Sequence, residues 1–317
     1  MRPELTAKIM VLALLSGAAA LLTPAAAVAG PWGADYFPNV PLTTQDGKVV
    51  RFYDDLLKGK SVAINLIYTR CSASCPLETA KLAQLQKIMG DRVGKDIFFY
   101  SISIDPKNDT PAALKAYMAK YHVGPGWLFL TGKAEDIELI SNKLGLASLT
   151  DAASREGHMP SLMIGNEPSG QWMRNSAVDN PRFLAKQIGN FLRWRDQEPG
   201  QSYAVLREPP KVDGGEYLFR SRCATCHTIG KGDGIGPDLA NVARRRDRSW
   251  VGRYIVEPDK MLEEHDPVAV ELFAKYKNVR MPNLSLGAGD VAVLLSHIEK
   301  ASAAAAESAR KAPLSVR

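Results

Sequence analysis

The sequence predicts an α/β domain followed by a small all-α domain. Short apolar runs alternate with helical patterns in residues 30–194, whereas residues 213–300 carry helical patterns without strand-like runs. The length of 317 residues also suits two domains. Apolar residues make up 45% of the chain and charged residues 23%, which excludes disorder, collagen and coiled coil as descriptions of the whole chain.

The charge distribution argues against a nucleic-acid partner. The net charge is +6, but no basic stripe of the kind that marks a nucleic-acid surface is present. The densest basic cluster consists of Arg244, Arg245, Arg246 and Arg248. We expect it to be solvated surface, or to dock an acidic redox partner.

The amino terminus predicts an export signal over residues 1–29. Arg2 and Lys8 precede an apolar run at 9–22, and small residues lead to a cleavage site after Ala29. An uncleaved anchor is the alternative, although the run is short for a span of about 20 residues. We expect a periplasmic protein, soluble or membrane-associated, with no integral membrane segment after cleavage. Thiols in that oxidising compartment must be kept reduced or bound to metal.

The first domain should contain buried strands separated by helices. Continuous apolar runs predict strands at 61–69, 97–105, 127–130 and 161–164. Apolar stripes at helical spacing predict helices at 76–89, 111–121, 134–144 and 181–194. Alternation of this kind is typical of a layered α/β fold.

A linker and a helical region follow. Residues 195–212 are rich in polar residues and include Pro209 and Pro210, so they predict the domain boundary. Helices are expected at 215–222 and 288–300, and the Ala-rich tail 301–317 is expected to be frayed helix or disordered. This second domain is short for a self-sufficient core, so a bound cofactor would help it fold.

Cys223, Cys226 and His227 form a C-x-x-C-H motif, the signature of covalent haem c attachment. Two thiols at this spacing reach the two vinyl groups of one porphyrin, and the histidine that follows lies beneath the iron. A structural disulfide and half a zinc site are the alternatives, but two further zinc ligands at suitable spacing are not evident.

The surroundings of this motif resemble class I cytochrome c. The similar segments are Gly215-Glu216-Tyr217-Leu218-Phe219, Gly236-Pro237-Asp238-Leu239 and Arg280-Met281-Pro282-Asn283-Leu284. The resemblance implies an electron carrier in which His227 and Met281 are the axial haem ligands. A thioether is a soft, weak ligand, and such a pair raises the haem potential.

Three other side chains are alternative distal ligands. Met261 and His265 lie in a polar run and are expected at the surface, and His297 lies on the terminal helix.

A second cysteine pair, Cys71 and Cys75, follows a predicted buried strand, and Pro76 opens the next helix. This location is characteristic of thioredoxin-like folds, in which a helix N-terminus stabilises thiolates. The C-x-x-x-C spacing is one residue longer than the redox C-x-x-C motif. It suits a metal held between two sulfurs, notably Cu(I).

Residues 40–194 resemble the Sco/SenC family of thioredoxin-like copper proteins. The resemblance rests on Tyr68-Thr69-Arg70-Cys71 through Cys75-Pro76, on Ser103-Ile104-Asp105-Pro106 with Asp109-Thr110-Pro111, and on a later histidine. It implies that copper is bound by Cys71, Cys75 and His158, which precedes a late strand. His122 is the alternative histidine.

The two resemblances together imply a copper-binding protein with one covalent haem. Its expected task is copper delivery to, or redox maintenance of, the copper A centre of cytochrome c oxidase, with electron exchange between haem and the copper/thiol site. The expected partners are the oxidase subunit carrying copper A, or another copper enzyme, and a redox partner for the haem. A metallochaperone and electron-transfer protein is favoured over a turnover enzyme.

Several alternatives stay open at this point. Cys71 and Cys75 could be the redox thiols of a thiol–disulfide oxidoreductase without stable copper, or a structural disulfide. The first domain could serve only to dock a partner of an electron carrier. A peroxidase that depends on Cys71 is a further possibility.

Overall fold

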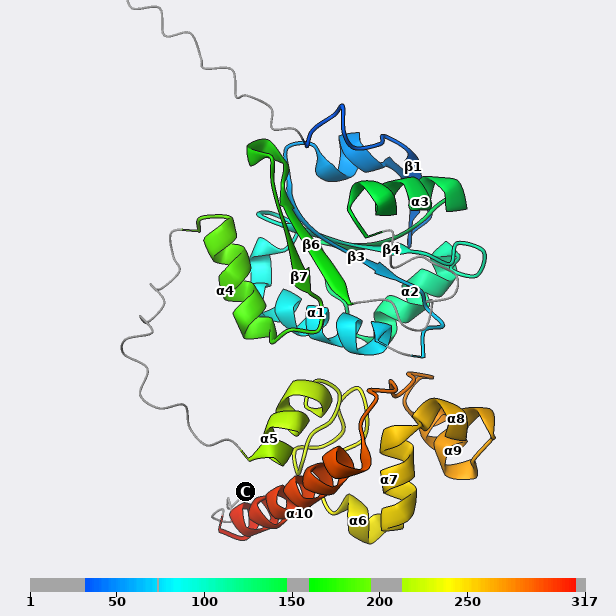
Figure 1. The fold of residues 1–317 in the computed structure, drawn as a ribbon, viewed down its shortest axis with the longest axis vertical. Helices are drawn as coiled ribbons and strands as arrows, with labels where there is room; N and C mark the ends of the chain where they lie inside the picture. The colour runs from blue at the N-terminus through cyan, green and yellow to red at the C-terminus, as the bar shows by residue number, and fades with distance from the viewer. Residues whose placement is uncertain (1–31, 73, 147–159, 195–212, 312–317) are drawn as a thin grey trace, which may run out of the picture.

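The computed structural model describes residues 32–72, 74–146, 160–194 and 213–311 (Figure 1). The predicted export signal, the linker and His158 lie outside the described residues. The structure confirms an α/β domain followed by a helical one. Within the described ranges, no helix is both long and apolar enough to cross a membrane.

The first domain is built on a seven-stranded sheet with the order β2-β1-β5-β4-β3-β6-β7. Its strands are β1 Pro41–Thr44, β2 Val49–Arg51, β3 Ser61–Ile67, β4 Phe98–Ser103, β5 Trp127–Thr131, β6 Ser161–Asn166 and β7 Gln171–Ser176. The central strands β3, β4 and β5 are parallel, with Val62 opposite Phe98 and Ile67 opposite Ser103. β1 and β6 join them antiparallel.

Helices cover both faces of this sheet. They are α1 Cys75–Met89, α2 Pro111–Lys120, α3 Ala134–Lys143 and α4 Pro181–Phe191. One apolar core packs α1, α2 and α4 against the sheet, and the other packs α3 and the π-helix η1 (Phe52–Leu57). The β3-α1-β4 unit, followed later by the β6–β7 hairpin and α4, is a thioredoxin-like arrangement. It places Cys75 at the first residue of α1, in the connection that follows β3.

The strands that sequence patterns did not predict lie toward the two edges of the sheet. β1, β2 and β7 are short or polar strands, and β7 (QWMRNS) is only half-buried. Edge strands of this kind lack the continuous apolar run that marks a central parallel strand.

The second domain is helical and surrounds a core of its own. Its elements are α5 Gly214–Leu218, the π-helix η7 Phe219–Cys223, α6 Val242–Arg245, α7 Arg248–Val256, α8 Pro258–Glu263, α9 Pro267–Lys275 and α10 Ala288–Lys311. α5 crosses α10 at Gly215, where a Cβ would lie 2.2 Å from the Val293 carbonyl oxygen. Glycine therefore permits this close crossing.

Two expectations for this domain differ from the structure. In the described part of the tail that was expected to be frayed helix or disordered, α10 continues as far as Lys311. Alanine favours helix, and the buried Ser302 hydroxyl accepts a 3.0 Å hydrogen bond from the Asn241 backbone N–H, which ties the extension to the domain. Met261, expected at the surface, is buried.

Candidate haem and thiol sites

The C-x-x-C-H motif borders a cavity of about 370 Å³ in the helical domain. Cys223, His227 and Met281 line it, and an adjoining space of about 60 Å³ is lined by Cys226, His227 and Met281. The remaining lining is largely apolar and includes Leu239, Val242, Trp250, Val251, Ile255, Leu284, Leu286, Leu294 and Ile298. The structure therefore brings all four predicted haem residues together.

The imidazole of His227 is oriented by its neighbours. Its Nδ1 lies 2.9 Å from the Pro237 carbonyl oxygen, which can only accept, so Nδ1 carries the proton and Nε2 has a free lone pair. Burial lowers the pKa of His227, which favours the neutral form that a metal ligand needs. Gly236 leaves room for the ring, because a Cβ there would lie 2.7 Å from Cε1.

Asp238 holds the loop that carries Pro237. Its carboxylate accepts hydrogen bonds from the Thr228 hydroxyl at 2.6 Å and from the backbone N–H groups of Gly230, Lys231, Gly232 and Ala240. Partial burial opposes the charge, but these donors outweigh it and hold the pKa of Asp238 well below its usual value. The loop that orients His227 is therefore held by the charged form of Asp238.

Two thiols, a neutral imidazole and a thioether around an apolar cavity fit a covalently bound haem. None of the three alternative distal side chains lines either cavity. Met261 is buried elsewhere, His265 is exposed in a left-handed turn, and His297 packs its ring on Phe219.

The second candidate site is formed by Cys71 and Cys75, which are 2% and 0% exposed and cluster with Tyr68 and Ile104. All four cysteines lie in the described part of the chain, and none forms a disulfide there. A hollow of about 200 Å³, lined by Tyr68, Arg70, Ile104 and Asp105, lies beside the cluster.

The thiol of Cys75 is not activated in this state. Burial, the hydrogen bond with Cys71 and the Glu78 carboxylate together raise its pKa well above the ordinary value. The expected stabilisation of a thiolate by the N-terminus of α1 is therefore outweighed. The Cys75 thiol is therefore protonated at neutral pH.

Glu78 is a buried residue that sequence reasoning missed. It lies one helical turn after Cys75, is fully buried, and accepts a 2.7 Å hydrogen bond from the Ser74 hydroxyl. The only available signal was its i+3 spacing from Cys75 on the helix. Its side chain adds a carboxylate to the surroundings of the thiols.

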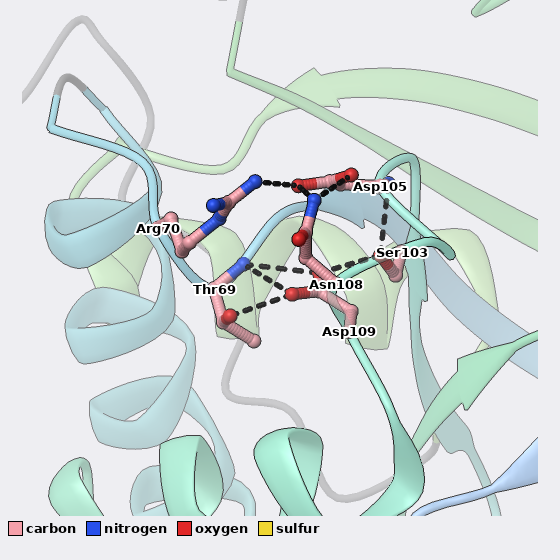
Figure 2. Close-up of polar contacts among 6 residues, drawn as sticks. All are labelled: Thr69, Arg70, Ser103, Asp105, Asn108 and Asp109. Atoms are coloured by element: carbon pink, nitrogen blue, oxygen red, sulfur yellow. Dashed lines mark hydrogen bonds and ion pairs between the residues drawn. The ribbon is translucent and has the colours of Figure 1, made fainter.

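A polar network fixes the chain just before the cysteine loop (Figure 2). The buried Asp109 carboxylate accepts hydrogen bonds from the backbone and the hydroxyl of Thr69 at 3.1 and 2.6 Å, and from Ser103 at 2.5 Å. Asp105 pairs with Arg70 at 3.0 Å and accepts from Asn108 at 2.8 Å. The end of β3 is thereby tied to the turn after β4.

The third predicted copper ligand is not part of this geometry. His158 lies outside the described residues, and the alternative His122 is exposed in a left-handed turn after α2. Among the described residues, His, Cys, Asp and Glu side chains form no group of three suited to a metal ion. The assignment of His158 stays a prediction.

The two domains pack on each other through the side of the sheet that α1 and α2 cover (Figure 1). Cys226, Ile235 and Val279 of the helical domain pack against the apolar core beneath α1 and α2. Gln84 of α1 donates a 3.4 Å hydrogen bond to the Thr225 carbonyl, inside the C-x-x-C-H motif. The haem motif therefore borders the thiol-bearing domain.

A pair of tyrosines lies between the cysteines of the two sites. The Tyr117 hydroxyl lies 3.3 Å from the Cys75 carbonyl oxygen, and its ring centroid is 4.8 Å from that of Tyr121. Tyr121 belongs to the apolar cluster against which Cys226 packs. Burial raises the pKa of both phenols well above the usual value, so they stay protonated.

The basic cluster of residues 244–248 is exposed. Arg245 donates to the Asp238 carbonyl oxygen, and Arg248 pairs with Glu299. Docking of an acidic partner there remains a prediction.

Two family models match the chain. The SCO1/SenC model matches residues 34–163, and the cytochrome c model matches residues 212–302. A SCO2-like protein of Rickettsia felis is 32% identical over 204 residues, which is 58% of this chain and 94% of that protein. A SCO2-like protein of Rickettsia conorii is 34% identical over 147 residues, which is 43% of this chain and 69% of that protein.

Solved structures of similar proteins cover the first domain. A SCO1/SenC family lipoprotein from Bacillus anthracis is 27% identical with a TM-score of 0.43, covering 50% of this chain and 94% of that one. BsSco, described as a member of the Sco family of cytochrome c oxidase assembly proteins with a disulfide switch, is 26% identical with a TM-score of 0.42, covering 50% and 96%. The two family models agree with both resemblances predicted from the motifs.

Proposed function

The chain belongs to the SCO1/SenC family and joins to it a cytochrome c domain, which implies haem c; on this premise we propose that it is an exported copper-binding redox protein. Its task is copper delivery to, or redox maintenance of, the copper A centre of cytochrome c oxidase or a similar copper enzyme. Its partners are the subunit that carries that copper and a redox protein that exchanges electrons with the haem. It acts in the periplasm.

The thiol pair is the proposed copper site, completed by His158. Two buried sulfurs in mutual contact suit a soft ion such as Cu(I). Because Cys75 is protonated at neutral pH, copper binding there must displace a proton. A relative in Stutzerimonas stutzeri, 28% identical over 129 residues, is provisionally named a copper-binding protein.

The helical domain is the proposed electron carrier. When bound, haem c supplies one-electron chemistry, at a potential that histidine–methionine ligation raises. Cys223 and Cys226 would hold the group covalently, His227 would offer Nε2 and Met281 its thioether. The Pro237 carbonyl and Gly236 keep the imidazole in place, and the apolar lining excludes water.

The observation that carries the proposal is that the haem-binding motif packs against the domain that contains the thiol pair. Tyr117 contacts the Cys75 backbone, Tyr121 contacts Tyr117, and Cys226 packs on the same cluster. Electron transfer slows steeply with distance, so a continuous set of packed groups between the two sites supports exchange within one molecule.

Energetics favours copper over a disulfide as the group that exchanges electrons with the haem. Stable protein dithiols often have potentials below about −200 mV, and each 30 mV of a two-electron gap is about 1.4 kcal/mol. Reduction of a disulfide from a high-potential haem would be steeply uphill, and it needs two electrons. Reduction of Cu(II) to Cu(I) would need one electron, which is the number that a single haem would supply, and thiolates favour Cu(I).

A thiol–disulfide oxidoreductase is the second candidate. The direct hydrogen bond between the two thiols supports it, because disulfide formation needs the sulfurs to be adjacent. In this case the dithiol would donate two electrons, one at a time, through the haem.

An anaerobic Cu(I) titration of the reduced, haem-loaded chain against a competing chelator separates the two candidates. The copper proposal expects one tightly bound equivalent that Cys71→Ser abolishes. Ser169→Ala, at an exposed turn after β6, is the matched control and should bind as the wild type does. Absence of tight binding to the wild type would reject copper and leave the oxidoreductase.

A further inference from the structure

The segment that carries Met281 is held at both ends by the thioredoxin-like domain. Lys120 Nζ, at the end of α2, donates a 3.2 Å hydrogen bond to the Asn278 carbonyl oxygen. The Asn283 backbone N–H donates a 3.3 Å hydrogen bond to the Ser72 carbonyl oxygen. Met281 lies between these two anchors, so its position depends on both domains.

One of the two anchors is part of the thiol loop itself. Ser72 follows Cys71 directly and lies between the two cysteines. Its carbonyl therefore belongs to the stretch of backbone that must adjust when the sulfurs change partners. Asn283, on the other side, is only two residues from Met281.

Asn283 divides its bonds between the domains. Its side chain donates a 3.1 Å hydrogen bond to Asp259 and accepts one from the Ser285 backbone at 3.0 Å, both inside the helical domain. Only its backbone N–H reaches the thiol loop. The segment is also constrained at its start, because Lys277 and Asn278 adopt left-handed backbone conformations, with φ of 57° at each.

We propose that Asn283 is a positioning residue whose backbone N–H couples the state of the Cys71/Cys75 pair to the distal ligand segment of the haem. Disulfide formation joins the sulfurs and passes two protons and two electrons to an external disulfide such as oxidised glutathione, and Cu(I) binding replaces the thiol protons, which pass to solvent, by a metal. Either change moves the Ser72 carbonyl and, through Asn283, alters the position of Met281.

The coupling is reciprocal, because a site that shifts another is shifted by it to the same extent. Cu(I) binding would shift the redox equilibrium of the haem by some factor. Oxidation or reduction of the haem would then shift the copper affinity of the thiol loop by the same factor. The inference rests on the proposed function only in taking Met281 as the distal ligand and the thiols as the reactive pair.

The test uses the full haem-loaded chain in three states: dithiol, disulfide made with oxidised glutathione, and Cu(I)-loaded. The haem reduction potential is measured by spectroelectrochemistry, and the long-wavelength charge-transfer band of the ferric haem reports methionine ligation. We expect the redox equilibrium constant of the haem to differ by about 5-fold to 10-fold between the dithiol and disulfide states. A tenfold difference corresponds to about 59 mV in the one-electron potential.

Two substitutions at one position isolate the backbone bond. Asn283→Pro removes the N–H donor and should abolish the difference between the states. Asn283→Ala keeps the donor, loses only the side-chain contacts and should retain the difference. Equal responses of the two variants would overturn the role of the N–H group.

The other anchor provides a second test if Asn283→Pro lacks the charge-transfer band of methionine ligation even in the dithiol state. Lys120→Met removes the bond to Asn278, and Lys115→Met, on the same helix but paired with Asp46, is its matched control. If the difference in haem potential between the states is reduced in Lys120→Met but not in Lys115→Met, the coupling is supported. If both variants show the wild-type difference, the coupling is overturned.

The outcomes also separate the inference from the proposed function. If the wild type binds no copper, the dithiol and disulfide states still test the coupling. If copper binds tightly but neither the potential nor the band changes among the three states, the coupling is wrong and the copper site stands.

Discussion

The Glu78 carboxylate opposes the formation of a thiolate at Cys75, since both lie buried on the first turns of α1. Glu78→Gln removes a negative charge and should therefore lower the pKa of Cys75. The ultraviolet absorbance of the thiolate, followed against pH in the reduced, copper-free chain, should rise at lower pH in the variant. The exposed Glu135→Gln on α3 is the control, and an unchanged or upward-shifted titration in Glu78→Gln would contradict the assignment.

Asp238 gives a second prediction for a single residue. Its pKa is lowered in the folded state, so its contribution to stability is present above the unfolded value of about 3.8 and is lost as pH falls through the folded value. Asp238→Asn should cost about 2 kcal/mol at neutral pH, because a neutral amide cannot accept the same set of bonds.

The free energy of unfolding is measured by urea titration with the haem absorbance as signal. The value for Asp238→Asn should differ less from that of the wild type below pH 4 than at neutral pH. Glu263→Gln, an exposed carboxylate in the same domain, is the control and should stay within about 0.5 kcal/mol of the wild type. A deficit of Asp238→Asn that persists unchanged at low pH would show that the charge is not what matters.

At the scale of elements, the crossing of α5 and α10 depends on a missing side chain. A Cβ at Gly215 would meet the Val293 carbonyl oxygen at 2.2 Å and His297 Cβ at 2.8 Å. Gly215→Ala must separate the two helices and should destabilise the helical domain by about 1–3 kcal/mol. The neighbouring Gly214→Ala is a matched control, since nothing lies within 4 Å of its Cβ position. Thermal unfolding followed by the haem absorbance compares them, and equal midpoints would contradict the crossing.

The central elements and both cysteine motifs could be predicted because their signals are local. A strand buried on both faces is mostly apolar, as β3 and β4 are, and C-x-x-C-H spacing is set by the covalent chain. The edge strand β7 escaped prediction because half-exposed polar residues carry no such signal. The burial of Met261 was missed for a similar reason, since a polar neighbourhood in sequence does not decide which side of a helix faces the core.

The features that tune the sites are tertiary and could not be read locally. Helical spacing put Glu78 near Cys75, but only the packed structure shows that the carboxylate is fully buried. The bond between Ser72 and Asn283 joins segments far apart in sequence, in different domains. Such contacts depend on how the domains dock, and the sequence of each domain alone does not reveal this.

For the whole molecule, the docking of the two domains should set the rate of internal electron exchange. Ile235 packs from the helical domain against the core beneath α1 and α2. Ile235→Glu places a charge in this contact and removes apolar burial worth about 1–2 kcal/mol, so it should loosen the docking. The haem absorbance should stay that of the wild type.

Transient kinetics on the copper-loaded chain measures this prediction. After rapid reduction of the haem, the wild type should pass its electron to Cu(II) at a rate independent of protein concentration, because donor and acceptor share one chain. Ile235→Glu should do so at least about tenfold more slowly, which corresponds to about 1.4 kcal/mol in the barrier. Val270→Glu, a half-exposed apolar position on α9, is the control for an added carboxylate and should keep the wild-type rate. An undiminished rate in Ile235→Glu would mean that the docked arrangement is not the one through which the electron passes.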